Sequence, residues 1–136
     1  MRNRIAAVLA LAIIVGVSAI PAGAFTMAEK VVVANSLVLV SRVPAGGLDA
    51  QERISAVNER LAPILGYELL TPDNIRLRRS HGQTSIFVGN RLLTTVTVAD
   101  ARANGTSVSR LARVWLHNAR MALPEARPYA NLYLTR

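Results

Sequence analysis

Apolar residues recur at helical spacing in two segments of the chain, and residues 49–66 form the first of them. Asp49 and Glu52 stand at its start in a capping-box pattern, in which each side chain accepts a hydrogen bond from a free backbone N–H. Gly66 stands where a left-handed residue would end the helix, and Pro63 predicts a kink or fraying in the last turn. The apolar stripe consists of Ile54, Val57, Leu61, Ile64 and Leu65.

The second helical pattern begins at Ser107 and is the more continuous of the two. Its apolar stripe consists of Val108, Leu111, Ala112, Trp115, Leu116, Ala119 and Leu123. Pro124 marks its approximate end, because proline does not continue the hydrogen bonds of a helix. We expect Trp115 at the centre of the core. The predicted structural core positions on the two helices are Ile54, Val57, Leu61, Val108, Leu111 and Trp115.

Shorter segments have the period of β-strands. Residues 31–42 predict two short strands around a tight turn at residues 34–36, where Asn35 tolerates positive φ. Residues 75–79 alternate apolar and charged side chains, as a strand with one solvated face does.

A second hairpin is predicted further along the chain. The dipeptide Gly89-Asn90 separates two strand-like segments, residues 84–88 and 92–98, and favours a tight turn between them. Residues 100–105 then predict a loose helical turn before the second helix.

The two halves of this pattern resemble each other. The segment from Val33 to Leu37 matches the segment from Val88 to Leu92 at an offset of 55 residues, and the apolar stripes match at an offset of 54. We interpret this as a hairpin–helix unit that occurs twice; the alternative is that any two such units with small turn residues look alike. The predicted fold is α+β, with one antiparallel sheet of about five strands and both helices on one face.

The start of the chain has a pattern typical of a cleaved signal peptide. Two arginines precede a sixteen-residue apolar run (residues 5–20), and Ala22 and Ala24 supply a cleavage site. The run is shorter than the roughly 20 residues that cross a bilayer. The predicted organisation is a signal peptide at residues 1–24, one α+β domain at 25–128 and a partly ordered tail at 129–136. The expected location is the periplasm or the medium; the alternative is an uncleaved leader anchored in the inner membrane.

Composition narrows the classes of site and partner. The chain has no cysteine, which excludes disulfides and cysteine-based zinc or redox sites, so hydrophobic burial must stabilise the domain. The formal net charge is +8, and every basic residue except Lys30 is arginine. This excess predicts anionic partners, or it reflects a codon bias alone. Because an exported protein rarely meets cellular nucleic acid, we expect no nucleic acid partner and favour lipid headgroups or acidic polysaccharide.

Residues suited to catalysis or metal binding are scattered. His81 lies in a polar turn and His117 lies among arginines, and neither has an acid at a spacing that would support a nucleophile. The eight acids form no cluster for a metal. We therefore predict no catalytic residues, no metal and no cofactor. A hydrolase whose carboxylates meet only in space, drawn from Glu52, Glu59 and Asp100, is the alternative.

One group of basic residues stands out on the second helix. At about 100° per residue, its members fall within about 80° of one another. They are Arg110, Arg113, His117 and Arg120. No acid lies between Asp100 and Glu125, and arginine binds phosphate or carboxylate through two parallel hydrogen bonds, so we identify the four as candidate anion-binding residues. A solvated helix face that keeps the protein soluble explains the same pattern and is the interpretation that the sequence alone favours. A second basic strip consists of Arg76, Arg78 and Arg79.

Several of these turn and core residues resemble a known family. The resemblance spans most of residues 31–128, and its motifs are Asn35-Ser36-Leu37, Gly46 to Ile54, Asn58 to Leu61, Phe87 to Ala101, Gly105, Leu111-Ala112, Trp115, Ala122-Leu123 and Glu125 to Pro128. The chain is similar to an extracytoplasmic accessory domain that precedes the pore region in a subset of bacterial MscS-type mechanosensitive channel proteins. The resemblance implies a free-standing relative of that domain without the pore region. It implies neither ion conduction nor catalytic residues.

The sequence thus predicts a non-catalytic exported interaction module and not an enzyme. Its expected partner is an envelope protein, bound through a strand edge or a basic face. The alternative is a binder of anionic envelope ligands, either phospholipid headgroups or acidic polysaccharide, through the arginine-rich helix face.

Overall fold

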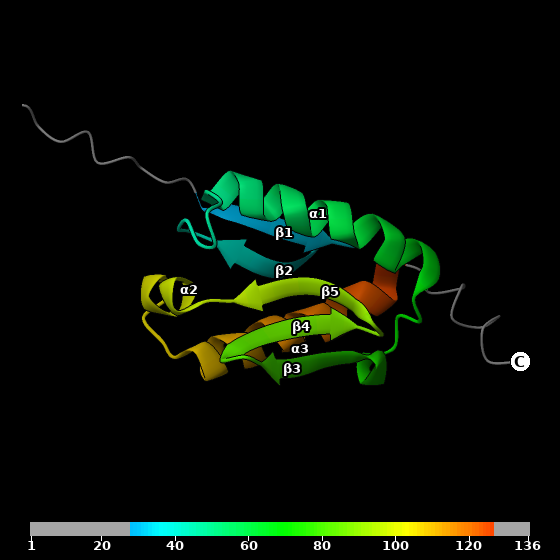
Figure 1. The fold of residues 1–136 in the computed structure, drawn as a ribbon. Helices are drawn as coiled ribbons and strands as arrows, with labels where there is room; N and C mark the ends of the chain where they lie inside the picture. Colours follow the sequence, from blue (N-terminus) through cyan, green and yellow to red (C-terminus); the bar gives the residue numbers. More distant parts are fainter. Residues whose placement is uncertain (1–27, 127–136) are drawn as a thin grey trace, which may run out of the picture.

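The computed structural model describes residues 28–126, and in this part of the chain five strands and three α-helices form an α+β fold (Figure 1). The strands are β1 (Glu29–Val33), β2 (Ser36–Ser41), β3 (Ile75–Ser80), β4 (Gln83–Val88) and β5 (Arg91–Val96). The helices are α1 (Ala50–Tyr67), α2 (Val98–Ala103) and α3 (Val108–Ala126), with the short 3-10 helix η1 (Pro72–Asn74) before β3. The predicted signal peptide, residues 1–24, and the predicted tail, residues 129–136, lie outside the described residues.

The expectation of one continuous sheet is wrong. The strands form two antiparallel sheets, one of β1 and β2 and the other in the order β3-β4-β5. Helix packing joins them: α3 contacts β2 as well as β3 and β4, and α1 contacts both β1 and β5. In Figure 1, α1 lies beside β1, and α3 lies behind the three-stranded sheet. Alternation along a strand indicates its buried face but not the strand beside it, so the pattern could not show the break.

Both predicted hairpins turn through two residues. Ala34 and Asn35 have φ of 48° and 61°, as a type I′ turn requires, whereas in the second hairpin Gly89 has φ of 56°. Gly89 also lies against the Glu68 side chain, and a Cβ there would collide with the carboxylate. The second turn therefore favours glycine for its backbone conformation, and any side chain there would also have to displace the Glu68 carboxylate.

The β1–β2 and β4–β5 hairpins each carry one extra residue, a β-bulge, at equivalent positions of their second strands. The pairing of β1 with β2 skips Val38, and the pairing of β4 with β5 skips Leu93. These positions are 55 residues apart, which is the offset between the similar segments of the sequence. Both side chains are fully buried. The bulge therefore adds an apolar side chain to the core on the same side in each hairpin.

The predicted capping box begins α1. The Glu52 N–H donates to Asp49 Oδ1, and the Asp49 N–H donates to Glu52 Oε2, both at 2.8 Å. A second capping box, formed by Thr97 and Asp100, begins α2. With this capping box, the segment predicted as a loose turn is the short helix α2. Strand β5 therefore ends at Val96, two residues earlier than expected.

The predicted C-terminal cap of α1 is wrong. Gly66 lies inside the helix, which continues to Tyr67 and ends at Glu68, where the backbone is extended (φ −92°, ψ 152°). The Glu68 N–H donates to the Ile64 carbonyl at 3.1 Å and satisfies one of the last carbonyl groups. Neither Pro63 nor Pro124 ends its helix.

One cluster of buried side chains connects the two sheets and the two long helices. Of the six predicted core positions, five are buried: Ile54, Val57, Leu61, Leu111 and Trp115. Val108, the first residue of α3, is only partly buried at the margin of the cluster. The strands contribute inward side chains from both sheets, including Val31, Val38, Ile75, Ile86 and Leu93.

Candidate functional site

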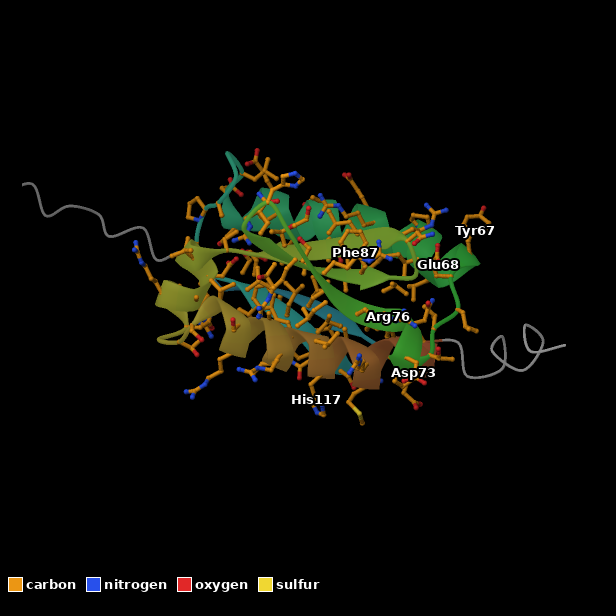
Figure 2. The ribbon with its side chains drawn as sticks, turned by 60° about the horizontal axis from the view of Figure 1, so that its bottom comes forward. Tyr67, Glu68, Asp73, Arg76, Phe87 and His117 are labelled. Carbon is orange, nitrogen blue, oxygen red and sulfur yellow. The ribbon has the colours of Figure 1, made fainter. Side chains whose placement is uncertain are left out.

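Three of the four predicted anion-binding residues are exposed on α3, namely Arg110, Arg113 and His117. The opposite stripe of the helix, which contains Leu111 and Trp115, packs into the core, so these side chains face solvent. In Figure 2, His117 points away from the fold. Neither arginine forms an ion pair with another of residues 28–126. Their charges are therefore available to a ligand.

The fourth residue, Arg120, forms a hydrogen bond within the fold instead of pointing freely into solvent. Its side chain is partly buried, and Nε donates a hydrogen bond to the Ile75 carbonyl at 3.0 Å. This bond ties α3 to the start of β3. Arg120 thus lies at the edge of the candidate site rather than on its open surface.

The fold adds an arginine to this site from the second basic strip. Arg79 lies on the side of β3 that faces α3, and its Nη2 donates to Ser109 Oγ at 3.1 Å. Arg113 Nε donates to the Ser109 carbonyl at 3.2 Å. Two arginines from segments 34 residues apart thus meet at Ser109. We call Arg79, Arg110, Arg113 and His117 the basic face.

The other two arginines of the strip have different surroundings. Arg78 lies over the Phe87 ring, 4.5 Å from its centroid, and donates to the Gly89 carbonyl at 2.9 Å. Arg76 Nε donates to the Asp73 carbonyl at 2.6 Å. Adjacent residues of a strand point to opposite sides of the sheet, which is why Arg78 and Arg79 diverge. The sequence placed these three arginines together, but only Arg79 joins the basic face.

Two exposed apolar side chains lie beside the basic residues of α3. Val114 is 49% exposed and Met121 is 62% exposed. The positions Arg110, Val114, His117 and Met121 follow the 4-3-4 spacing of one helix face. The outer surface of α3 therefore presents positive charge and apolar atoms together.

A buried ion pair connects the two halves of the fold. Arg53 of α1 and Asp100 of α2 form two parallel hydrogen bonds of 2.7 Å, and their side chains are 11% and 1% exposed. Arg53 also donates to Ser41 Oγ at 3.1 Å and to the Val43 carbonyl at 2.9 Å. The carboxylate accepts further bonds from the Thr97 hydroxyl, 2.7 Å, and the Thr97 N–H, 3.0 Å.

No local pattern in the sequence predicts this pair. Asp100 belongs to the capping box of α2, but its ionic partner lies 47 residues earlier. Arg53 borders the apolar stripe of α1, directly before Ile54, and that border position was the only hint that the arginine would be covered.

The same contacts act on the acidity of Asp100. Burial opposes ionisation of the carboxyl group, but hydrogen bonds from Arg53 and Thr97 and the Arg53 charge outweigh it. The pKa of Asp100 is therefore held below its ordinary value of 3.8. Asp100 is an anion that the fold stabilises, and not a carboxyl group poised to donate or accept a proton near neutral pH.

We expect this carboxyl group to make stability depend on acid pH. Because its pKa is lower in the folded chain, its contribution is complete above the unfolded pKa and is lost as the pH falls through the folded pKa. The difference in free energy of unfolding between the wild type and Asp100→Asn should be constant from about pH 5 to 7 and shrink below about pH 4. Urea unfolding at each pH measures it. A difference that stays constant down to about pH 2.5 would contradict the expected ionisation.

Histidines and acids do not gather in the described part of the chain. No group of three or more His, Cys, Asp or Glu residues among 28–126 is placed to hold a metal ion. His81 and His117 are both exposed, and Glu59 faces solvent on α1. The absence of metal, cofactor and catalysis stays a prediction.

Within residues 28–126, neither long helix combines enough length with enough apolar character to cross a membrane. The outward side of α3 carries arginines, and that of α1 carries Glu52 and Glu59.

Fold and site together define an α+β domain of two linked hairpin–helix segments, with an arginine-rich face on its last helix. A family model described as a domain of unknown function (DUF8459) matches residues 30–126, and the chain belongs to this family. No curated protein and no solved structure matches the chain.

Proposed function

We propose that this protein is a non-catalytic interaction module that binds anionic phospholipid surfaces through the basic face. The observation that carries the proposal is the meeting of Arg79 with Arg113 at Ser109, beside Arg110. No acid among residues 28–126 is paired with any of these three arginines. Several free guanidinium groups on one surface raise the local concentration of anions and bind phosphate bidentately.

The apolar side chains on α3 favour a lipid surface over an acidic polysaccharide. Val114 and Met121 are about half exposed or more and lie beside the basic residues of α3. On an anionic bilayer, the arginines would contact phosphate while these side chains enter the boundary between headgroups and acyl chains. A hydrated polysaccharide offers no comparable apolar environment.

An extracytoplasmic location is part of the proposal. It is supported by the leader pattern at residues 1–24 and by the resemblance to the accessory domain of MscS-type channel proteins, both of which are features of the sequence. The basic face would then meet the outer leaflet of the inner membrane or another anionic envelope surface. Association with a channel protein is a hypothesis that rests on the resemblance alone.

We also propose that the fold arose by duplication of one hairpin–helix unit. The equivalent bulges at Val38 and Leu93 support this, because nothing in the local turn chemistry requires them at the same offset. The packing supports it too, since α1 contacts the second strand of the other hairpin, β5, and α3 likewise contacts β2. Both long helices would then occupy equivalent places against a shared core.

A protein partner is the second candidate function. Val32 and Leu37 face each other across the β1–β2 hairpin, and both are about half exposed. An exposed apolar pair on a two-stranded sheet can pack against another protein. This surface is separate from the basic face, so the two functions can be tested independently.

Vesicle binding tests the lipid proposal. We expect the protein to bind vesicles of mixed phosphatidylglycerol and phosphatidylcholine, and to lose affinity steeply as salt rises from about 50 to 500 mM. The double variant Arg110→Glu/Arg113→Glu should lower the affinity at least about 30-fold, since each basic residue near an anionic surface contributes about 1 kcal/mol. Cosedimentation measures the bound fraction.

The control reverses the same number of charges elsewhere. Lys30→Glu/Arg42→Glu changes two exposed basic residues, one in β1 and one directly after β2, and should bind as the wild type does. All variants carry the same N-terminal segment, so any affinity of that segment for lipid cancels in the comparison. Equal losses of affinity in both double variants would show that net charge alone causes binding, and would contradict a specific role of the basic face. Binding to pure phosphatidylcholine that matches the mixed vesicles would reject the proposal.

A further inference from the structure

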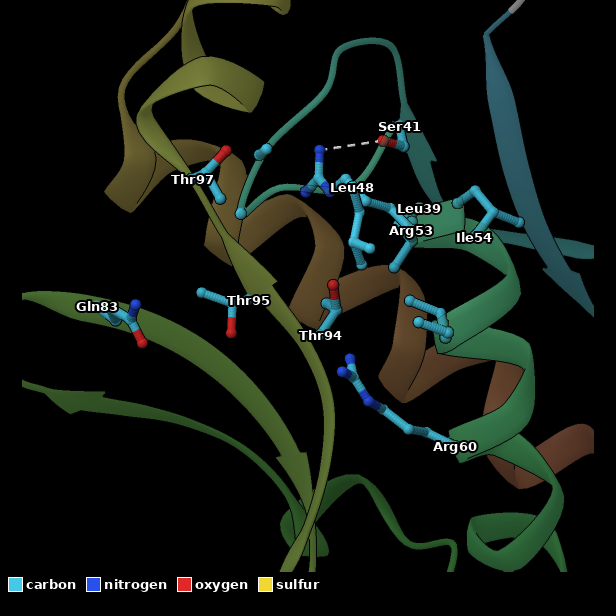
Figure 3. A pocket seen from close by; sticks show the side chains of 14 residues that line it. Leu39, Ser41, Leu48, Arg53, Ile54, Arg60, Gln83, Thr94, Thr95 and Thr97 are labelled. Atoms are coloured by element: carbon cyan, nitrogen blue, oxygen red, sulfur yellow. Dashed lines mark hydrogen bonds between the residues drawn. The ribbon is translucent and has the colours of Figure 1, made fainter. Parts of the chain in front are cut away.

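A cavity of about 250 Å³ lies away from the basic face, between α1, the end of β2, the loop that follows it and β5 (Figure 3). The loop closes on itself through hydrogen bonds between Ala45 and Leu48, 2.9 and 3.2 Å, and Gly46 and Gly47 have positive φ at its tip. This closure holds Leu48 over the cavity, where it is one of the lining residues. The volume is below the about 300–1,000 Å³ of sites for drug-sized ligands, so only a small molecule fits.

The charge inside the cavity is positive. Two arginines line it, Arg53 and Arg60, and no acid does. Arg53 is neutralised by Asp100, which is not a lining residue. Arg60 forms no ion pair with another of residues 28–126, and its guanidinium donates only one long hydrogen bond, 3.4 Å, to the Leu93 carbonyl. One unpaired positive charge thus remains, which matches a ligand with a single negative charge.

A hydroxyl group without a partner lies beside this charge. Thr94 follows Leu93 on β5 and lines the cavity. The residue as a whole is 5% exposed, and its hydroxyl makes no hydrogen bond to another of residues 28–126. In Figure 3 the Arg60 side chain extends toward Thr94. By contrast, the neighbouring hydroxyls are used: Thr95 bonds Ser85 at 2.9 Å, and Thr97 bonds Asp100 at 2.7 Å. Among residues 28–126 only the Thr106 hydroxyl is a fully buried side-chain atom without a partner, so the Thr94 hydroxyl keeps access to solvent and can donate to a bound acceptor.

The rest of the wall is partly apolar. Its larger apolar side chains are Leu39 from β2, Leu48 from the loop, and Ile54 and Val57 from α1, with Ala56 between them. The polar side chains that also line the cavity are Ser41, Gln83, Thr95 and Thr97. The small side chain of Ala56 leaves room between the turns of α1 that carry Arg53 and Arg60. The cavity therefore combines apolar side chains with polar groups that can orient a ligand, as small-molecule sites do.

We propose that this cavity binds a small monocarboxylate with a short apolar chain. The carboxylate accepts hydrogen bonds from the Arg60 guanidinium and the Thr94 hydroxyl, and the chain lies against Leu39, Leu48 and Ile54. A guanidinium fork matches the two oxygens of a carboxylate, and one free arginine balances one negative charge. A phosphate monoester, which carries up to two charges, would leave one of them unpaired. This site is independent of the lipid-binding function proposed above.

Hexanoate titrated into the full chain tests the proposal, with 1-hexanol as the neutral analogue. Methyl NMR signals of Ala56 and Thr94 should shift with hexanoate and saturate. Arg60→Gln should weaken hexanoate binding about tenfold or more, because a hydrogen bond to a charged group contributes about 1.5–3 kcal/mol, while 1-hexanol binding changes less than about twofold. Arg60 is exposed, so this variant should fold. Thr94→Val, which keeps the shape of the side chain, should weaken hexanoate binding to a smaller degree.

The controls separate this site from other basic surfaces. Arg42→Gln removes an exposed arginine that does not line the cavity and should leave hexanoate binding unchanged. Arg60→Gln should leave vesicle binding unchanged, and Arg110→Glu/Arg113→Glu should leave hexanoate binding unchanged. No shift of the Ala56 and Thr94 methyl signals at about 20 mM hexanoate, or equal weakening of hexanoate and 1-hexanol by Arg60→Gln, would overturn the proposal.

Discussion

Replacement of Arg53 by Met is expected to lower the free energy of unfolding by about 3–5 kcal/mol at neutral pH. The variant leaves the Asp100 carboxylate 1% exposed and without its cation, and it also removes the bonds to Ser41 and the Val43 carbonyl. Loss of one partner of a buried pair is costly because the remaining charge is neither solvated nor compensated. Urea unfolding followed by the fluorescence of Trp115, the single tryptophan, measures the change.

Two further variants show whether the loss comes from burial of the pair. Arg91→Met breaks the ion pair with Glu68, whose side chains are 47% and 22% exposed, and should cost less than about 1 kcal/mol. Arg53→Met combined with Asp100→Asn should recover at least about 1 kcal/mol of the single variant's loss, because the unpaired charge is gone. If Arg53→Met lowers the free energy of unfolding no more than Arg91→Met does, water must reach the Arg53–Asp100 pair, and this ion pair does not join α1 to α2 as described.

Truncation of Trp115 to Ala is expected to cost a similar amount, about 3–5 kcal/mol. Trp115 is buried in the cluster that contains strand residues of both sheets, so a cavity at this position would affect both halves of the fold. Unfolding in urea is followed by far-ultraviolet circular dichroism, since the variant lacks tryptophan. Met121→Ala, at a position 62% exposed on the same helix, is the control and should change stability by less than about 0.5 kcal/mol. A loss below about 1 kcal/mol for Trp115→Ala would contradict its place in the core.

Much of the local structure was predictable because its causes are local. Asn35 and Gly89 mark two-residue turns, and alternation around them predicted both hairpins. Asp49 and Glu52 lie three residues apart, and the capping box that they form needs no other part of the chain. The predicted end of α1 was wrong because Gly66 permits a left-handed cap but does not require one.

The candidate site was predictable only in part. Helical periodicity places Arg110, Arg113 and His117 on one exposed face, because the opposite stripe must be buried. The same periodicity included Arg120, which instead bonds the Ile75 carbonyl of β3. Periodicity describes the direction of a side chain around its own helix, whereas the neighbouring strand decides whether that side chain is free.

The sequence by itself therefore determined which segments are strands and helices, where the hairpins turn and which side of α3 is basic, since these depend on residues a few positions apart. Only the tertiary structure decided that the five strands divide into two sheets, that Arg53 pairs with Asp100, and that Arg79 joins the basic face. It also brought Arg60 and Thr94 to one cavity. Each of these arrangements joins residues 30 or more positions apart, through packing between elements that no local pattern encodes.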